Sequence, residues 1–544
     1  MLKVIPLSSL VKVFSDEEPK QKPFNKLSMF RNEKTSLQIA FSSDVDSALT
    51  LSVASALGSA VRFYLVDEIY SGLAVGKPQD DYTLRGNGNS FPDLLRPICD
   101  NTLKAEAGKW YSIWVEVVPD ECLLPSGEHI VAVELFDGKD KKSVELVFDV
   151  IDGVLPEQKL IYTNWFHTDC LATHYGVKVF SEKYWEIVEN YLRVARQYGM
   201  NMALTPIFTP PLDTKIGKER ETVQLVGVKV ENGKYIFDFS KVDRWLEMCD
   251  RVGIEYYEIS HLTTQWGAKK CPKIVADADG VEKKIFGWNT RASGRKYREF
   301  LTAFAAEFKR YIYAKGVENK VYFHVSDEPF IAVLRSYRKA SELIKGLFGE
   351  FKIIDALSDY RFYQRGLIDL PIPSNDHIER FIDNVPELWT YYCGAQFKKV
   401  SNRFFSMPSQ RNRIIGYQMY KYKVKGFLHW GYNYWYTRFS LRKVDPFKES
   451  DAGGSFPSGD SYVVYPGDDG KPLQSLRLKV FNDALQDMRA LEMAESLIGR
   501  EKTMEILEKG VETPITFAEY PHSDEWQLLR REEINSAIRE AMGK

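Results

Sequence analysis

The sequence lacks the cysteine and histidine patterns of a disulfide-stabilised or zinc-binding protein. Its six cysteines lie far apart with no Cys-x-x-Cys pair, and its eight histidines are scattered with no His-Glu-x-x-His motif. Disulfide frameworks and zinc sites require close, regular spacing of such residues. We therefore expect no disulfide framework, no catalytic metal and no cofactor.

Excess charge and long apolar runs are also missing. Lys and Arg number 73 against 75 Asp and Glu, which gives a net charge of -2. No global field then favours nucleic acid, and no run approaches the ~20 apolar residues of a membrane span. The apolar N-terminus is broken by Pro6 and Lys12 and has no cleavage site, so we interpret it as a first strand. We expect a cytoplasmic protein as the sequence is given, or a secreted one if a leader was removed; no pattern indicates its oligomeric state.

The first 155 residues are predicted to form an antiparallel β-sandwich. Short segments in which apolar and polar residues alternate recur between turn residues, as is typical of such a fold. These segments are 36–41, 60–66, 110–118, 129–136 and 143–150, and a charged linker follows at 152–158.

From 156 to 470, strands alternate with amphipathic helices, which predicts parallel strands joined by right-handed crossovers. Eight strands, the number of a (β/α)8 TIM-type barrel, are expected at 161–167, 200–206, 254–260, 321–326, 351–358, 388–393, 403–406 and 426–431. The alternative is an open doubly wound sheet, but its Gly-rich nucleotide loop is missing after the first strand. Residues 471–544 are predicted to form helices that pack on the barrel.

Two adjacent carboxylates end the predicted fourth strand. Asp327 and Glu328 stand in the sequence Ser-Asp-Glu-Pro at 326–329. Neighbouring carboxylates raise one another's pKa, a costly arrangement that is typical of catalytic sites. Glycosidic bond cleavage needs one protonated and one ionised carboxyl group. The alternative interpretation is a surface turn with two solvated acids.

The predicted last strand is followed by an aromatic segment, 429–436, in which six of eight residues carry rings. Trp430 or Trp435 could stack on a pyranose, with Tyr432 beside them and Asn433 bonding hydroxyl groups. The alternative is a packed barrel end. A Gly-rich loop at 453–467 contains Asp460 and is either a hairpin that lines the pocket or an ordinary surface loop.

Two further side chains are candidates for substrate binding. His324 lies in the predicted fourth strand, four residues before Glu328, where a buried core histidine is the alternative. Tyr391 lies in the predicted sixth strand. Together with polar residues at the other predicted strand ends, His324 and Tyr391 are expected to form a polar pocket with aromatic residues around its opening.

These motifs, in this order, resemble glycoside hydrolase family 123 and the wider group that shares domain of unknown function 4091. The resemblance depends on Ser-Asp-Glu-Pro, on Gly-Tyr-Asn-Tyr-Trp at 431–435, on the segment 459–467, and on Ser-Leu-Arg at 475–477 with 483–487. The resemblance covers residues 156–499. The sandwich corresponds to the family only in its position along the chain. The resemblance implies a retaining β-N-acetylgalactosaminidase in which Glu328 is the acid/base and Asp327 orients the 2-acetamido group of the substrate.

Two other functions stay open at this stage. One is a two-carboxylate glycosidase acting on a sugar without an acetamido group, with Asp359 or Asp169 as the second acid. The other is a carbohydrate-binding barrel without catalytic activity. The first interpretation implies a glycan or glycoconjugate partner with a terminal amino sugar.

Overall fold

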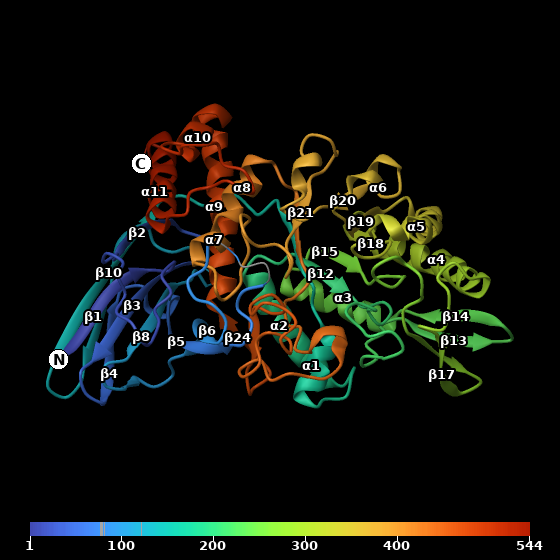
Figure 1. The fold of residues 1–544 in the computed structure, drawn as a ribbon, viewed down its shortest axis with the longest axis horizontal. Coiled ribbons are helices and arrows are strands. Elements are labelled where there is room, and N and C mark those ends of the chain that lie inside the picture. Colours follow the sequence, from blue (N-terminus) through green and yellow to red (C-terminus); the bar gives the residue numbers. More distant parts are fainter. Residues whose placement is uncertain (77–79, 81, 121, 544) are drawn as a thin grey trace.

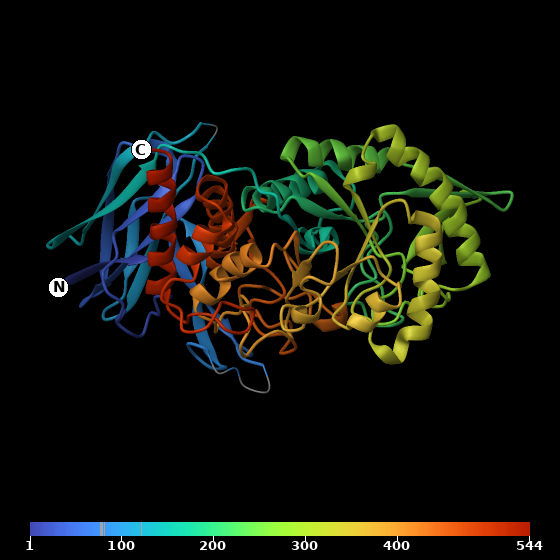
Figure 2. The same cartoon turned by 90° about the horizontal axis from the view of Figure 1, so that it is seen from above.

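The computed structural model describes residues 1–76, 80, 82–120 and 122–543. A β-sandwich lies at one end of the molecule and a parallel barrel at the other, with the C-terminal helices between them (Figures 1 and 2). Both chain ends lie on the side of the sandwich (Figure 1).

The sandwich consists of two sheets, and every segment expected to be a strand is one. The first sheet has the order β1 (Leu2–Ser8), β3 (Thr35–Ser43), β8 (Trp110–Val117), β5 (Val61–Ser71), β6 (Asn89–Pro97), β24 (Pro472–Ser475) and β23 (Val464–Pro466). The second has the order β2 (Lys26–Phe30), β10 (Lys141–Ile151), β9 (Gly127–Phe136), β4 (Ser47–Ser55) and β7 (Thr102–Ala105). Pairing is antiparallel except between β2 and β10. Alternate residues such as Leu37, Ile39 and Phe148 are fully buried between the sheets.

The chain returns to this sandwich after the barrel. Gln474 of β24 pairs with Leu95 of β6, so β24 and β23 extend the first sheet. Strands separated by nearly four hundred residues in sequence cannot be paired by local periodicity. This return fixes the loop before β23 between the two parts of the molecule.

The barrel contains eight parallel strands in sequential order. They are β11 (Ile161–Asn164), β12 (Met202–Thr205), β15 (Tyr256–Ile259), β18 (Val321–His324), β19 (Lys352–Ala356), β20 (Leu370–Ile372), β21 (Trp389–Tyr391) and β22 (Gly426–His429). β22 pairs back onto β11. Between β20 and β21 the closure is a single bridge, Ser374 to Tyr391, and the Tyr391 N–H donates to the Pro373 carbonyl at 3.1 Å. The near-closed barrel confirms the expected fold, and β18 is the fourth strand.

Two of the expected strand assignments were wrong. The segment expected as the sixth strand is the seventh, β21, and 403–406 is an irregular turn. The sixth strand is β20, which has only three residues and contains Pro371. A strand this short shows no period, and proline argues against a strand because it donates no ladder hydrogen bond.

The sequence predicts helices at 181–199, 242–253, 294–314, 332–347, 409–423, 475–497, 502–509 and 524–542, and helices occupy these segments. They are α1 (Thr168–Tyr175), α2 (Glu182–Gln197), α3 (Ser240–Val252), α4 (Arg295–Lys315), α5 (Leu334–Phe348), α6 (Tyr360–Gln364), α7 (Ser409–Arg413), α8 (Ile415–Lys421), α9 (Leu476–Ile498), α10 (Arg500–Leu507) and α11 (Asp524–Ala541), of which α1 and α6 were not expected. The Ser181 side chain caps α2 by accepting from the Tyr184 N–H. α11 lies against the sandwich, and Arg531 in it pairs with Glu33 of the sandwich and Asp487 of α9.

Excursions after β12 and β15 form a small four-stranded sheet that the sequence analysis missed. Its strands, in order, are β14 (Lys234–Asp238), β13 (Gly227–Glu231), β16 (Ile274–Ala278) and β17 (Val281–Phe286). In the part of the chain that the structure describes, none of the helices is both long and apolar enough to traverse a bilayer.

Candidate active site

Asp327 and Glu328 follow β18 at the carboxyl end of the barrel strands. Asp327 is only 8% exposed, and Glu328 has a φ of 42°, in the left-handed region that a residue other than glycine rarely adopts. Two backbone hydrogen bonds of 2.9 Å hold this turn: Trp266 N–H donates to the Asp327 carbonyl, and Glu328 N–H donates to the Ala356 carbonyl. Strain retained in this way is common at functional sites.

Both acids line a cavity of about 420 Å³. Three of the side chains predicted to bind substrate, Tyr391, Trp430 and Asp460, line it with them. The loop 453–467 contributes Ser455, Phe456 and Pro457 in addition to Asp460, so it lines the pocket. The cavity therefore joins the ends of β18, β21 and β22 to a loop that the sandwich holds in place.

Tyr391 orients Glu328. Its hydroxyl group donates a hydrogen bond of 2.7 Å to Glu328 Oε1, and the Cys393 Sγ lies 3.9 Å from the same oxygen. Burial, with the negative charge of Glu328 next to it, raises the pKa of Tyr391 well above its usual value, so the phenol keeps its proton and remains a donor.

Asp327 holds a proton more strongly than an ordinary aspartate. Burial raises its pKa well above the usual value, and the charges of Glu328 and Asp355 add to this effect, whereas His324 opposes it. Because the two adjacent carboxyls are coupled, the proton belongs to the pair. The pair can thus hold one proton at a pH where two isolated carboxyls would both be ionised.

Asp460 fixes the ring of Trp430. The indole Nε1–H donates to Asp460 Oδ2 at 3.1 Å, and burial raises the pKa of Asp460 to about 7. The ring also makes edge contacts with Tyr434 and Phe456, at centroid separations of 5.0 and 5.2 Å. Trp430 therefore presents an oriented, half-buried ring to the cavity.

Three predicted sugar contacts lie in the packing behind the cavity instead. The Tyr432 hydroxyl donates to the Tyr191 carbonyl at 3.0 Å, and Trp435 Nε1–H donates to the Val464 carbonyl at 3.3 Å. Asn433 accepts from the His167 N–H at 2.9 Å and donates to its carbonyl at 3.1 Å. These three side chains are buried and form hydrogen bonds within the protein. Their positions agree with the alternative interpretation of the aromatic segment, a packed end of the barrel.

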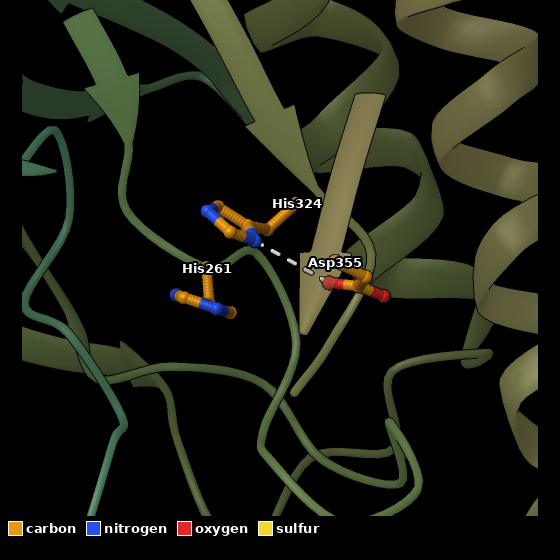
Figure 3. A group of neighbouring side chains, drawn as sticks. All are labelled: His261, His324 and Asp355. Carbon is orange, nitrogen blue, oxygen red and sulfur yellow. Dashed lines mark hydrogen bonds and ion pairs between the residues drawn. The ribbon is translucent and has the colours of Figure 1, made fainter. Parts of the chain in front are cut away.

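His324 lies beneath the cavity, with no exposed side-chain surface. Its Nε2 is 2.6 Å from Glu258 Oε1. Its Nδ1 is 3.3 Å from Asp355 Oδ1, the contact drawn as a dashed line in Figure 3. Burial lowers the pKa of His324, but the hydrogen bonds to Asp355 and Glu258 outweigh this effect and raise it to about 9. His324 is therefore a buried imidazolium between two carboxylates, and it is not among the residues that line the cavity.

One group of side chains has the composition of a metal site. Ligand atoms of His261, His324 and Asp355 all lie within 4.8 Å of one another (Figure 3). Both nitrogens of His324 already meet carboxylate oxygens, and its ring stacks on His261 at 4.1 Å with an interplanar angle of 22°. An imidazole that binds a metal ion directs a nitrogen lone pair at the ion within the plane of its ring. The lone pairs of two stacked rings run parallel to each other, so they do not meet at one ion. The geometry favours a hydrogen-bonded group of Glu258, His324 and Asp355 with the His261 ring stacked on it, and we assign no metal to it.

Comparison with known proteins decides the family. The model of the glycoside hydrolase 123 catalytic domain matches residues 165–494, which include both acids and the aromatic segment. The chain belongs to glycoside hydrolase family 123. No curated protein matches the sequence.

The fold of family 123 extends over the whole chain. A family 123 glycoside hydrolase from Clostridium perfringens, analysed for glycolipid glycan hydrolysis, superposes with a TM-score of 0.76 at 17% identity, covering 100% of this chain and 98% of that one. β-Glucuronidases from Parabacteroides merdae and Bacteroides uniformis give TM-scores of 0.30 at 11% and 12% identity. They cover 91% and 87% of this chain and 52% and 49% of theirs. The first similarity shows that this family 123 chain shares the arrangement of sandwich, barrel and C-terminal helices, and as a family 123 member it is a glycoside hydrolase.

The carboxylates considered as a second acid do not face the cavity of this family 123 site. Asp169 forms a buried pair with Arg220, with oxygen to nitrogen distances of 2.6 and 2.7 Å. Asp359 pairs with Arg361 at 2.6 and 2.8 Å and caps α6. Among the described residues, the further carboxylates that line the cavity are Asp213 and Asp460.

Sequence reasoning missed several residues of the cavity wall. Asp213, Gln265 and Trp266 come from the loops after β12 and β15, which have no periodic pattern. Asp213 has a φ of 40° and accepts from the Tyr434 hydroxyl and from the Phe439 N–H at 3.0 Å. Trp165, directly after β11, was predicted only as part of a strand. The position of Trp165 at a barrel strand end was a signal that could have found it.

Proposed function

We propose that this family 123 enzyme removes terminal β-linked N-acetylgalactosamine by a retaining, substrate-assisted mechanism. The observation that carries the proposal is that the two acids differ in the spaces that they line. Asp327 lines only the 420 Å³ cavity, whereas Glu328 lines this cavity and also an adjacent groove. A proton donor to the glycosidic oxygen must lie where sugar and leaving group meet, and a group that holds the acetamido substituent must lie on the sugar side.

The proposed reaction uses the two acids of this chain and the acetamido group of the substrate. The acetamido oxygen attacks the anomeric carbon while the glycosidic bond breaks and Glu328 protonates the departing oxygen. Asp327 accepts the acetamido N–H and stabilises the positive oxazolinium. Glu328 then removes a proton from water, whose oxygen attacks the anomeric carbon and reopens the ring, so the β configuration is retained.

Binding of the substrate would place the proton shared by the two acids on Glu328. In the free site, burial and the charge of Glu328 favour a proton on Asp327. A hydrogen bond donated by the acetamido N–H favours the ionised form of Asp327. The proton of the coupled pair then lies on Glu328, where protonation of the leaving oxygen requires it. A sugar without the acetamido group supplies no such bond.

The test compares nitrophenyl glycosides of N-acetylgalactosamine and galactose. We expect wild type to cleave the first and not the second, Asp327→Asn to lower kcat by roughly 100-fold or more, and Glu328→Gln to abolish cleavage of poor leaving groups. Asp369→Asn is the control, because Asp369 is exposed and lies outside both cavities, paired with Lys345. Full activity of Asp327→Asn, or equal cleavage of the plain galactoside, would contradict the mechanism.

A further inference from the structure

Arg477 connects the sandwich to the loop that contains Asp460. It is the second residue of α9, and its side chain is buried. Its Nε and one terminal nitrogen donate to the two carboxylate oxygens of Asp93 in β6, at 2.7 and 2.9 Å. Its other terminal nitrogen donates to the carbonyls of Gly459 and Tyr462, at 2.8 Å each. One guanidinium group thus holds the chain on both sides of Asp460 and is itself held by a sandwich residue.

The end of the sandwich strand β5 holds the same part of the chain at two further points. The Ser71 hydroxyl donates to the Ser458 hydroxyl at 2.7 Å, and the Ser458 N–H donates to the Leu73 carbonyl at 2.8 Å. The Leu73 N–H donates to Asp451 Oδ2 at 3.0 Å, just before the loop 453–467. Asp93, Ser71 and Ser458 are all buried, so these hydrogen bonds are shielded from water and hold the loop against the sandwich.

Asp460 carries this attachment into the wall of the sugar cavity. Its Oδ2 accepts from the Trp430 indole at 3.1 Å, and both side chains line the cavity. An indole has a single N–H group, and here Asp460 accepts it. If Asp460 moves, the Trp430 ring loses the hydrogen bond that sets its orientation.

The two acids are held by the barrel and not by this loop. The Trp266 N–H donates to the Asp327 carbonyl, and the Glu328 N–H donates to the Ala356 carbonyl. A change on the sandwich side should therefore disturb the orientation of the Trp430 ring and leave the turn of the two acids in place.

We infer that Asp93 is a positioning residue for substrate binding, because it sets the orientation of the Trp430 ring through Arg477 and Asp460. The sandwich thus completes the sugar site of the barrel without contacting the sugar. Asp93 is not among the residues that line the cavity, and it takes no part in bond cleavage. This inference rests on the proposed function, because it takes Trp430 as a contact of the terminal sugar.

The test measures kcat and KM of Asp93→Asn on the nitrophenyl β-glycoside of N-acetylgalactosamine. Asparagine keeps the size of the side chain and removes the charge that holds Arg477. A residue that affects binding in the ground state and in the transition state alike changes KM and leaves kcat unchanged. We expect KM to rise by about fivefold to tenfold, the value of one oriented ring contact, and kcat to change by less than about twofold.

The matched control is Glu33→Gln. Glu33 is likewise a buried sandwich carboxylate that is paired with an arginine, Arg531 of α11. The side-chain hydrogen bonds of Glu33 join it to Arg531 and to the Phe30 N–H, and in the described part of the chain none reaches the loop 453–467. We expect this variant to unfold at a lower urea concentration than wild type with an unchanged KM. An equal rise of KM in Glu33→Gln would show that the effect of Asp93→Asn is a general loss of stability, and the inference would fail.

A second comparison tests whether Asp93 acts through the Trp430 ring. In a Trp430→Ala background, Asp93→Asn should cause no further rise of KM, because the ring that it positions is missing. If Asp93→Asn does not fold, Arg477→Lys takes its place, since a lysine cannot bind the Asp93 carboxylate and both carbonyls in the same way.

The inference and the proposed function fail in different ways. If KM rises equally with and without Trp430, or if kcat falls and KM does not rise, the inference is wrong and the proposed function stands. If wild type cleaves no N-acetylgalactosaminide at all, the proposed function fails, and the inference fails with it.

Discussion

The Nε2 atom of His324 lies 2.6 Å from Glu258 Oε1, and this contact is the centre of a buried chain under the active site. Glu258 also accepts from the Trp165 indole at 2.7 Å, and Trp165 lines the cavity. On the other side, both oxygens of Asp355 accept from the Ser326 N–H at 3.1 Å, directly before Asp327. The chain thus connects the cavity wall to the backbone of the turn that carries Asp327 and Glu328.

Replacing His324 by glutamine should weaken this chain. Glutamine has similar reach but no charge, so Glu258 and Asp355 lose their shared counterion. A buried ion pair that loses one partner costs about 3–5 kcal/mol. We expect urea denaturation to show a loss of this size, and kcat to fall more than KM rises, because the residue acts on the catalytic turn and not on substrate.

The stability of wild type should also depend on pH through His324. The pKa of His324 in the folded protein, about 9, lies above the ordinary histidine value of 6.5. Its contribution is therefore complete below pH 6.5 and is lost as pH rises through about 9, by roughly 3 kcal/mol. Unfolding free energies of His324→Gln should lack this decline. A parallel decline in wild type and variant would contradict the assignment.

Asp460 should also make wild type less stable as pH rises, at lower pH than His324 does. Burial raises its folded pKa from 3.8 to about 7, so the folded state prefers the protonated form. Wild type then loses stability as pH rises from about 4 to 7, and Asp460→Asn should not. We expect the variant to gain about 4 kcal/mol over wild type between pH 4 and pH 8 in denaturant titrations. If the difference in unfolding free energy between Asp460→Asn and wild type were the same at pH 4 and pH 8, this prediction would be refuted.

Tyr391→Phe should leave Glu328 in place but poorly oriented. The substitution removes only the hydroxyl that donates at 2.7 Å to Glu328 Oε1. Misplaced proton donors lower the rate of the chemical step, so we expect kcat to fall about tenfold for a poor leaving group and less for nitrophenyl. The same loss with both substrates would show that the hydroxyl acts in some other way.

The backbone of Glu328 offers a test of strain. Its φ of 42° favours glycine, which has no Cβ to clash in that conformation. Although glycine usually destabilises a fold relative to alanine, Glu328→Gly should be about 1 kcal/mol more stable than Glu328→Ala. Both variants lack the acid, so their unfolding free energies can be compared without regard to activity. Greater stability of the alanine variant would show that the turn is relaxed.

Much of the architecture could be predicted because periodicity is local. The alternation in 110–118 and 143–150 identified sandwich strands, and Ser181 and Gly253 marked helix ends. The sixth strand could not be found, since Leu370–Ile372 is too short to show a period. Part of the site was accessible for the same reason: Asp327 and Glu328 are adjacent in sequence and end a strong strand.

The sequence alone determined the sandwich followed by alternating strands and helices, and the placing of two adjacent acids at one strand end. Only the tertiary structure decided which aromatic residues face the cavity. Trp430 and Trp435 stand five residues apart in one segment, yet the first is fixed by Asp460 in the cavity wall and the second by Val464 behind it. The loop that contains Asp460 is positioned by β24, which pairs with β6 hundreds of residues away. Such contacts depend on which distant surfaces meet, and this information is not carried by any local pattern.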